Sequence, residues 1–226
     1  MAKEVSVACI SDIHGVELHK EFMPKADILV IAGDATKRGC HREFLDFAKN
    51  METWSGNYGH IVYTPGKHDT ALEHYPDRYI DMLCDKNTNL NVLINSDIVL
   101  CDLHIWGTPY SKYDPLWSFT ERDNQRKYLT SHIAPNTDVL VSYSPPLGLL
   151  DIEKYSNSGN YCNVGCQFLL HALKTLQPKL HAFGKSHVNY GVGYYNKKKT
   201  IYANGSLMCD YTSPWNPVRV FQIKPK

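Results

Sequence analysis

Residues 5–11 read VSVACIS and residues 28–32 read ILVIA, and an aspartate follows each of these almost wholly apolar runs within two positions. Short apolar runs of this kind predict strands that are buried on both faces of a sheet. Residues 60–64 predict a third such strand. Before it, residues 41–54 carry apolar side chains at helical spacing, which predicts a helix packed on a sheet. Alternating strands and helices predict parallel strands joined by crossovers.

The second half of the chain contains more predicted strand. Short apolar runs predict these strands at 92–94, 98–100, 104–106, 139–142 and 180–183, the first three as a meander, and a hairpin at 190–195 and 200–203. An amphipathic helix is predicted at 166–176, ended by Pro178. The pattern predicts an α/β fold of two mixed β-sheets flanked by helices. Because no repeat or linker divides the chain, we expect a single domain over residues 1–226.

Composition narrows the classes of partner. The 226 residues carry 24 basic and 23 acidic side chains, a net charge of +1, which argues against a surface for extended nucleic acid. No apolar run approaches the ~20 residues of a membrane helix, so we expect no membrane partner. Seven cysteines, an odd number, and a first segment that enters a strand without a signal sequence lead us to expect a cytoplasmic protein. A small phosphate-bearing ligand remains compatible with the near-zero net charge, because it requires only local positive charge.

Polar side chains gather where the predicted strands end, which is where open α/β sheets place ligands. Each cluster alone is a weak signal, but five in order are much harder to attribute to chance. The clusters are Asp12-Ile13-His14, Gly33-Asp34, Gly66-Lys67-His68-Asp69, Ser142-Tyr143-Ser144-Pro145-Pro146 and Gly184-Lys185-Ser186-His187. Carboxylates and imidazoles that converge on one crevice make a site for a divalent metal.

This order of clusters resembles the signature of calcineurin-like metallophosphoesterases, and within them the metallophosphoesterase-domain-containing subfamily. The matching stretches span nearly the whole chain: Ile10–Gly15, Ala26–Gly39, Ile105–Tyr110, Asn136–Gly148, Val164–Cys166, Pro178–Gly184 and Asn204–Ser206. The resemblance implies the four-layer αββα sandwich of the calcineurin-like phosphoesterase fold. It also implies a binuclear site that hydrolyses phosphomonoesters or phosphodiesters, cyclic nucleotides included.

The resemblance also implies roles for individual residues. Asp12, His14 and His187 match ligands of the first metal, and Asp34 matches the carboxylate that bridges both metals. His68 matches the histidine near the leaving group, and we expect Asp69 beside it to orient the ring. These matches imply that the chain binds one divalent ion. They do not distinguish Mn, Fe, Zn and Mg, and the alternative is that no ion binds.

The second metal site departs from the family pattern. The family has Asn, His and His where this chain has Lys67, Tyr143 and Lys185. An ammonium group has no lone pair and a neutral phenol is a poor ligand, so none of the three replaces a metal ligand. Two ammonium groups do restore the two positive charges of the missing ion. We therefore expect Lys67, Tyr143 and Lys185 to contact a phosphate-bearing substrate, because lysine binds phosphate as a point charge.

Three functions remain open at this point. The leading hypothesis is a weakened metal-dependent phosphodiesterase, since loss of one good electrostatic contact commonly costs ~10²–10³ in rate. The first alternative is an inactive nucleotide-binding or phosphate-binding pseudoenzyme, in which the lysines pair with Asp34 and Tyr143 only packs. The second is a metal-independent phosphodiesterase that uses Lys67, His68, Tyr143 and His187 on a substrate with its own nucleophile.

An aromatic segment suggests that the ligand is a nucleotide. Residues 106–119 hold several aromatic side chains separated by turn residues, and they resemble the corresponding loop of the subfamily. Rings beside a phosphate site could stack a nucleobase, although each ring could equally close the core. Of these rings, Tyr110 and Tyr113 are the better candidates for exposure, and Tyr110 is the expected ligand contact.

Overall fold

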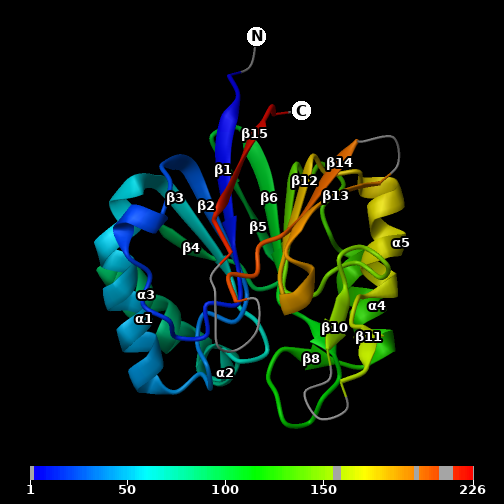
Figure 1. Ribbon diagram of the computed structural model, residues 1–226, viewed down its shortest axis with the longest axis horizontal. Helices are drawn as coiled ribbons and strands as arrows, with labels where there is room; N and C mark the ends of the chain where they lie inside the picture. The colour runs from blue at the N-terminus through cyan, green and yellow to red at the C-terminus, as the bar shows by residue number, and fades with distance from the viewer. Residues whose placement is uncertain (1–2, 155–158, 196–198, 209–215, 226) are drawn as a thin grey trace.

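The structure is a computed structural model that describes residues 3–154, 159–195, 199–208 and 216–225. Two large sheets face each other, and helices cover the outer face of each (Figure 1). This is the predicted α/β class and two-sheet sandwich, which are therefore confirmed.

The first sheet has the strand order β15-β1-β2-β3-β4. Its strands are β1 (Val5–Ile10), β2 (Ala26–Ala32), β3 (Tyr58–Thr64), β4 (Leu90–Val92) and β15 (Arg219–Ile223). The first four run parallel, and β15 pairs antiparallel with β1. Its helices are α1 (His41–Trp54), α2 (Thr70–His74) and α3 (Pro76–Lys86), with short 3₁₀ turns η1 (Lys20–Phe22) and η2 (Ser55–Asn57).

The second sheet has the order β13-β14-β12-β9-β6-β5. Its strands are β5 (Ser96–Leu100), β6 (Leu103–Thr108), β9 (Val139–Ser142), β12 (Leu180–Phe183), β13 (Gly191–Tyr195) and β14 (Thr200–Asn204). Helices α4 (Asp123–Ser131) and α5 (Gln167–Leu176) pack together beside it. Smaller elements are the pair β7 (Ser111–Lys112) and β8 (Thr120–Glu121), the pair β10 (Ile152–Lys154) and β11 (Tyr161–Asn163), and η3 (His187–Asn189).

Three apolar cores hold these layers together. In β1, Val7 and Cys9 face the core between the sheets, whereas Ala8 and Ile10 face the core under α1 and α3. Both faces of the strand are thus out of water, which is why its sequence is a continuous apolar run. A third core lies between the second sheet and the helices α4 and α5, and includes Leu169.

Two predictions about the elements were incomplete. The meander predicted at 92–106 is wrong, because β4 pairs with β3 in the first sheet while β5 and β6 belong to the second. Helix α4 was not predicted, because Arg126 is its one buried residue and it therefore lacks an apolar stripe. The turn expected between β13 and β14 falls largely outside the described residues.

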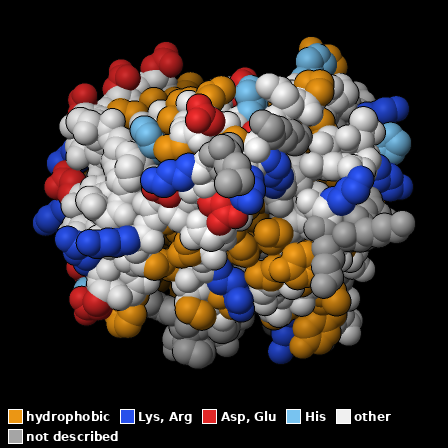
Figure 2. All heavy atoms as spheres, turned by 90° about the horizontal axis from the view of Figure 1, so that it is seen from above, with side chains coloured by type: hydrophobic (Ala, Val, Ile, Leu, Met, Phe, Trp, Pro, Cys, Tyr) orange, Lys and Arg blue, Asp and Glu red, His pale blue; other side chains and the backbone are white. Residues whose placement is uncertain are grey.

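The end of the molecule that carries the chain termini shows no large patch of one charge. Lysine and arginine side chains lie among acidic and hydrophobic ones there (Figure 2). Among the described residues, no helix is long and apolar enough to cross a membrane.

The carboxyl-terminal ends of the parallel strands of both sheets lie together at the end of the molecule opposite the chain termini (Figure 1). The backbone N–H of Ser11, after β1, donates to the carbonyl of Gly205, after β14, over 2.8 Å. Gly205 in turn donates to Phe183 at the end of β12. Further bonds join the other loops: Asp12 N–H donates to the Gly33 carbonyl, His68 N–H to the Asp34 carboxylate, and Gly184 N–H to the Tyr143 carbonyl. The loops after β1, β2, β3, β9 and β12 therefore surround one crevice, as expected from the position of the polar clusters.

Candidate functional site

Four polar residues just after strand ends adopt left-handed backbone conformations. Their φ angles are +52° at Asp12, +49° at His14, +52° at Asp34 and +72° at Lys185. A non-glycine residue in this region costs of order 1–3 kcal/mol, and such costs cluster at functional sites. The backbone is therefore held in strained turns that fix the direction of these side chains.

Asp12, His14 and His187 form the first candidate metal cluster. The Nε2 atoms of the two histidines are 3.3 Å apart, and Asp12 Oδ1 lies 3.9 Å from His14 Nε2 and 3.7 Å from His187 Nε2. Four ligands at about 2.0–2.1 Å from a tetrahedral ion would be roughly 3.4 Å apart. The separation of these three atoms thus fits a single divalent ion among them.

The charge state of His14 also suits a metal ligand. Burial lowers the pKa of His14 to about 4, with the nearby side chains of His187, His68 and Lys67 acting in the same direction and Asp12 opposing them. The imidazole is therefore neutral near pH 7 and has a lone pair available, as metal binding requires.

Asp34 and His68 extend this cluster. Ligand atoms of His14, Asp34 and His68 all lie within 4.8 Å of one another, and His68 Nε2 is 3.9 Å from Asp34 Oδ2. We call Asp12, His14, Asp34 and His187 the metal half of the crevice. His68 Nδ1 is 2.7 Å from the carbonyl oxygen of Lys37. Because a carbonyl only accepts, Nδ1 carries the hydrogen and Nε2 is the atom that faces the cluster.

Asp69 does not orient the ring of His68, which corrects that expectation. Its buried carboxylate accepts hydrogen bonds from the backbone N–H of Gly66 and Thr36 and from the Thr36 hydroxyl, over 2.8–2.9 Å. Burial, followed by the neighbouring Asp34 carboxylate, raises the pKa of Asp69. Asp69 thus ties the loop after β2 to the loop after β3, and the Lys37 carbonyl positions the ring.

Lys67, Tyr143 and Lys185, which we call the lysine half, adjoin the metal half. The backbone N–H of Lys185 donates to the carboxylate of Asp12 over 2.9 and 3.2 Å. Lys185 Nζ lies 5.6 Å from the centre of the Tyr143 ring. Among the described residues neither Lys67 nor Lys185 has a carboxylate oxygen within 4.0 Å of its ammonium nitrogen. The lysines therefore do not form the ion pair with Asp34 that the pseudoenzyme hypothesis requires.

Lys185 is the more constrained of the two lysines. Burial, together with the positive charges of Lys67 and Arg126, lowers its pKa to about 8, and the negative charge of Asp34 acts in the opposite direction. The ammonium group is still mainly protonated near pH 7. Its charge is poorly screened by solvent, so its interaction with an anion is stronger than at an exposed site.

Tyr143 forms the floor of the crevice. Its ring is 1% exposed, and a Cβ atom at Gly33 would lie 2.4 Å from it. A Cβ at Gly66 would meet both this ring and the Asp34 carboxylate, at 2.8 and 2.3 Å. Only glycine permits this approach. The burial favours packing over direct contact with a ligand for Tyr143.

Trp117 is the residue of the aromatic segment that lies at the site, in place of the expected ligand contact Tyr110. Its ring centre lies 4.1 Å from that of His68 and 5.4 Å from Lys67 Nζ. Tyr110 instead packs against Phe119 and the core under α1, and Tyr113 is exposed beneath Arg122. The backbone bond from Ser118 N–H to the Lys67 carbonyl, 3.2 Å, brings Trp117 to the crevice.

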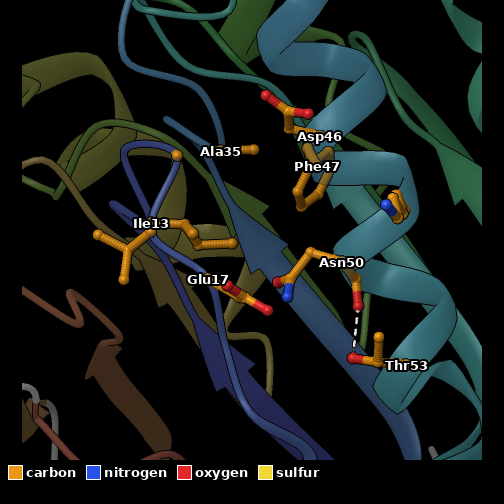
Figure 3. Close-up of a pocket in the computed structure, with 10 residues that line it drawn as sticks. Ile13, Glu17, Ala35, Asp46, Phe47, Asn50 and Thr53 are labelled. Atoms are coloured by element: carbon orange, nitrogen blue, oxygen red, sulfur yellow. Dashed lines mark hydrogen bonds between the residues drawn. The ribbon is translucent and has the colours of Figure 1, made fainter.

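A groove of about 360 Å³ lies between α1 and the loop after β1, which carries Asp12 and His14 of the metal half. In Figure 3, Ile13 and Glu17 from this loop face Asp46, Phe47, Asn50 and Thr53 of α1. Two carboxylates and one lysine line it, those of Glu17, Asp46 and Lys49. The groove backs onto the site without containing the metal half, and its charges do not favour phosphate.

Comparisons with known proteins agree with this architecture. The UPF0046 protein K07C11.7 of Caenorhabditis elegans is 30% identical over 201 residues, 83% of this chain and 65% of that protein. Human metallophosphoesterase domain-containing protein 1 is 27% identical over 95% of this chain and 70% of its own length. Both relatives are therefore longer than this chain.

A solved structure and a family model complete the comparison. The TT1561 protein of Thermus thermophilus superimposes with a TM-score of 0.63 at 13% identity, covering 89% of this chain and 88% of that one, which shows a shared fold. The calcineurin-like phosphoesterase model matches residues 5–189. That family normally binds divalent metals, and the described residues contain candidate ligand groups for them. The chain belongs to the calcineurin-like phosphoesterase family.

Proposed function

We propose that this protein is a phosphodiesterase that acts on a nucleotide or cyclic nucleotide. In this proposal one divalent ion occupies the metal half, and Lys67 and Lys185 take the place of the second ion. The supporting observation is that a set of ligand atoms spaced for one ion adjoins two ammonium groups that have no carboxylate oxygen within 4.0 Å among the described residues. Family membership supports phosphoester hydrolysis in general; the diester, the nucleotide and the single ion are the proposal.

Asp12, His14 and His187, with Asp34 beside them, would hold the ion. A divalent ion bound by such a set supplies Lewis acidity for water and for a phosphoryl oxygen. The side-chain types suit zinc, manganese or iron. The hydrogen bond from the Lys185 backbone to Asp12 keeps the carboxylate in place.

The lysines bind the negative charge of the phosphate. Each ammonium group can donate a hydrogen bond to a non-bridging oxygen. These hydrogen bonds become stronger as negative charge develops on the phosphoryl oxygens in the transition state. They do not coordinate or activate a nucleophile. We therefore expect slower turnover than a two-ion site would give.

His68 transfers the proton to the leaving group. The Lys37 carbonyl holds the hydrogen on Nδ1, so the proton that moves is on Nε2. Asp34 Oδ2 lies 3.9 Å from this Nε2. Trp117, which contacts the same ring, offers a surface on which a nucleobase can stack.

The test is turnover of an activated diester, bis(p-nitrophenyl) phosphate, and of cyclic mono- and dinucleotides, with manganese and with chelator. We expect turnover with manganese and none with chelator. Turnover that survives chelator would overturn the metal-dependent mechanism in favour of lysine, tyrosine and histidine chemistry. Folded protein that binds nucleotide without any turnover would make this a binding protein instead.

A further inference from the structure

A second basic pocket opens beside Lys185, on the side away from the α1 groove. Its volume is about 310 Å³. Three basic side chains line it, those of Lys112, Arg126 and Lys185, against the single carboxylate of Asp123. Lys185 is shared with the lysine half, so the pocket continues directly from the crevice. The balance of charge is opposite to that of the groove in Figure 3.

Two helices begin at this pocket. Asp123 and Gln167 are the first residues of α4 and α5, and both line it. Neither helix has a side-chain hydrogen bond from its N-cap residue. The amino-terminal end of a helix carries a partial positive charge and N–H groups without helical partners. The two helix starts therefore add to the attraction for an anion.

Arg126 supplies an independent observation. The residue is only 6% exposed, and its Nε has no hydrogen-bond partner among the described residues. One terminal nitrogen pairs with Asp123 over 2.6 Å, and the guanidinium lies 5.5 Å from the Phe168 ring. A buried donor without a partner is costly unless a ligand or water completes it. The guanidinium fork matches the oxygens of a phosphate.

We propose that this pocket is a subsite for a second phosphate, so that the substrate carries two phosphate groups a short distance apart. The inference rests on the proposed function, because Lys185 must face the phosphate that is attacked. It names the substrate class as a nucleoside diphosphate or a cyclic dinucleotide, each with two phosphates, in preference to a nucleoside monophosphate. The second phosphate lies between the starts of α4 and α5, with Arg126 and Lys112 on its oxygens.

The test compares AMP with α,β-methylene-ADP, which is not hydrolysed at its bridge, by calorimetry at saturating magnesium. We expect the diphosphate to bind at least ~10-fold more tightly, the effect of one charge-assisted hydrogen bond. Lys112→Glu, at an exposed position, should reduce this preference several-fold, and Arg126→Gln should abolish it. The control Lys127→Glu, an exposed lysine of α4 that faces another groove, should leave the preference unchanged.

The outcomes separate the subsite from the main site. Equal affinity for the two nucleotides in the unaltered protein would overturn the subsite while leaving the proposed function standing. An unchanged preference in Lys112→Glu would also overturn the subsite. This test remains available if Arg126→Gln fails to fold. If neither nucleotide binds, the subsite is wrong, and turnover of the diesters then decides the proposed function by itself.

Discussion

The metal half and the lysine half of the crevice both come from loops that follow strands, yet their side chains carry opposite charge. In the metal half, the ligand atoms of Asp12, His14 and His187 lie 3.3–3.9 Å from one another. In the lysine half, Lys67 and Lys185 are held apart over aromatic rings, with no carboxylate within 4.0 Å among the described residues. Buried ligand atoms that face one another are stabilised by a metal ion between them. Buried ammonium groups without a paired carboxylate are stabilised by an anionic ligand. The difference supports the proposal that one half binds a metal ion and the other binds the phosphate group of a ligand.

The largest expected effect comes from removing the charge that organises the metal half. Asp12→Asn keeps the shape of the side chain but removes the negative charge that faces His14 and His187. We expect loss of retained metal and a fall in turnover of ~10²–10³. Metal content and diester turnover, measured on the same preparation, check this. Asp85→Asn, at an exposed position on α3, is the control, and unchanged turnover in Asp12→Asn would remove the metal half from the mechanism.

The lysine half should lose activity without losing metal. Lys185→Met removes the ammonium group but keeps the backbone N–H that donates to Asp12. Because a hydrogen bond to a charged group contributes about 1.5–3 kcal/mol, we expect kcat/KM to fall roughly 10–150-fold. Metal content should stay at the level of the unaltered protein. Lys174→Met on α5 serves as the control, and a loss of metal in Lys185→Met would mean that the two halves do not act separately.

The support beneath the lysine half should weaken in acid. Burial lowers the pKa of His181 to about 3, and His181 Nε2 lies 2.7 Å from the hydroxyl of Ser142, next to Tyr143. Between pH 6.5 and about 3 the unfolded chain holds a proton here that the folded chain does not. The free energy of unfolding therefore falls as pH decreases, by about 1.4 kcal/mol per pH unit from this group.

Urea unfolding at several pH values measures this dependence. His181→Gln should flatten the slope between about pH 6.5 and 4.5 by that amount. His171→Gln, an exposed position on α5, should not. If both variants keep the slope of the unaltered protein, the acid sensitivity has another source.

The smallest effect concerns the Trp117 ring. It contacts His68, which lies beside the metal half, and Lys67 of the lysine half. Stacking on a nucleobase contributes ~1–3 kcal/mol, and we expect the lower end because two side chains already cover the ring. Trp117→Ala should thus raise KM for a nucleotide diester about fivefold while leaving a base-free diester unaffected. Tyr113→Ala, on the same loop, is the matched control; equal losses on both substrates would indicate a structural role.

Local patterns in the sequence predicted much of this architecture. Helix α1 and strand β9 have the predicted bounds, because an amphipathic stripe and a short apolar run are local signals. The convergence of Asp12 and Asp34 was also predictable, since they follow neighbouring parallel strands, whose ends must meet. Lys185 follows β12 of the second sheet, and its position depends on how the two sheets pack.

What the sequence did not reveal depends on contacts between distant segments. Trp117 reaches His68 because Ser118 and Phe119 bond to Lys67 and Glu73, far earlier in the chain, and no local pattern encodes that pairing. Asp69 follows His68 directly, which suggested that it orients the ring. In the structure its carboxylate is committed to buried backbone N–H groups, whose positions only the fold defines.

The central claim is that the lysine half takes the place of one ion. Metal content by elemental analysis, on protein reconstituted with manganese and freed of excess, tests it most directly. We predict one ion per chain, rising to two in the triple variant Lys67→Asn, Tyr143→His, Lys185→His, which restores the ligand types of the resembled pattern. Two ions per chain in the unaltered protein would contradict the account.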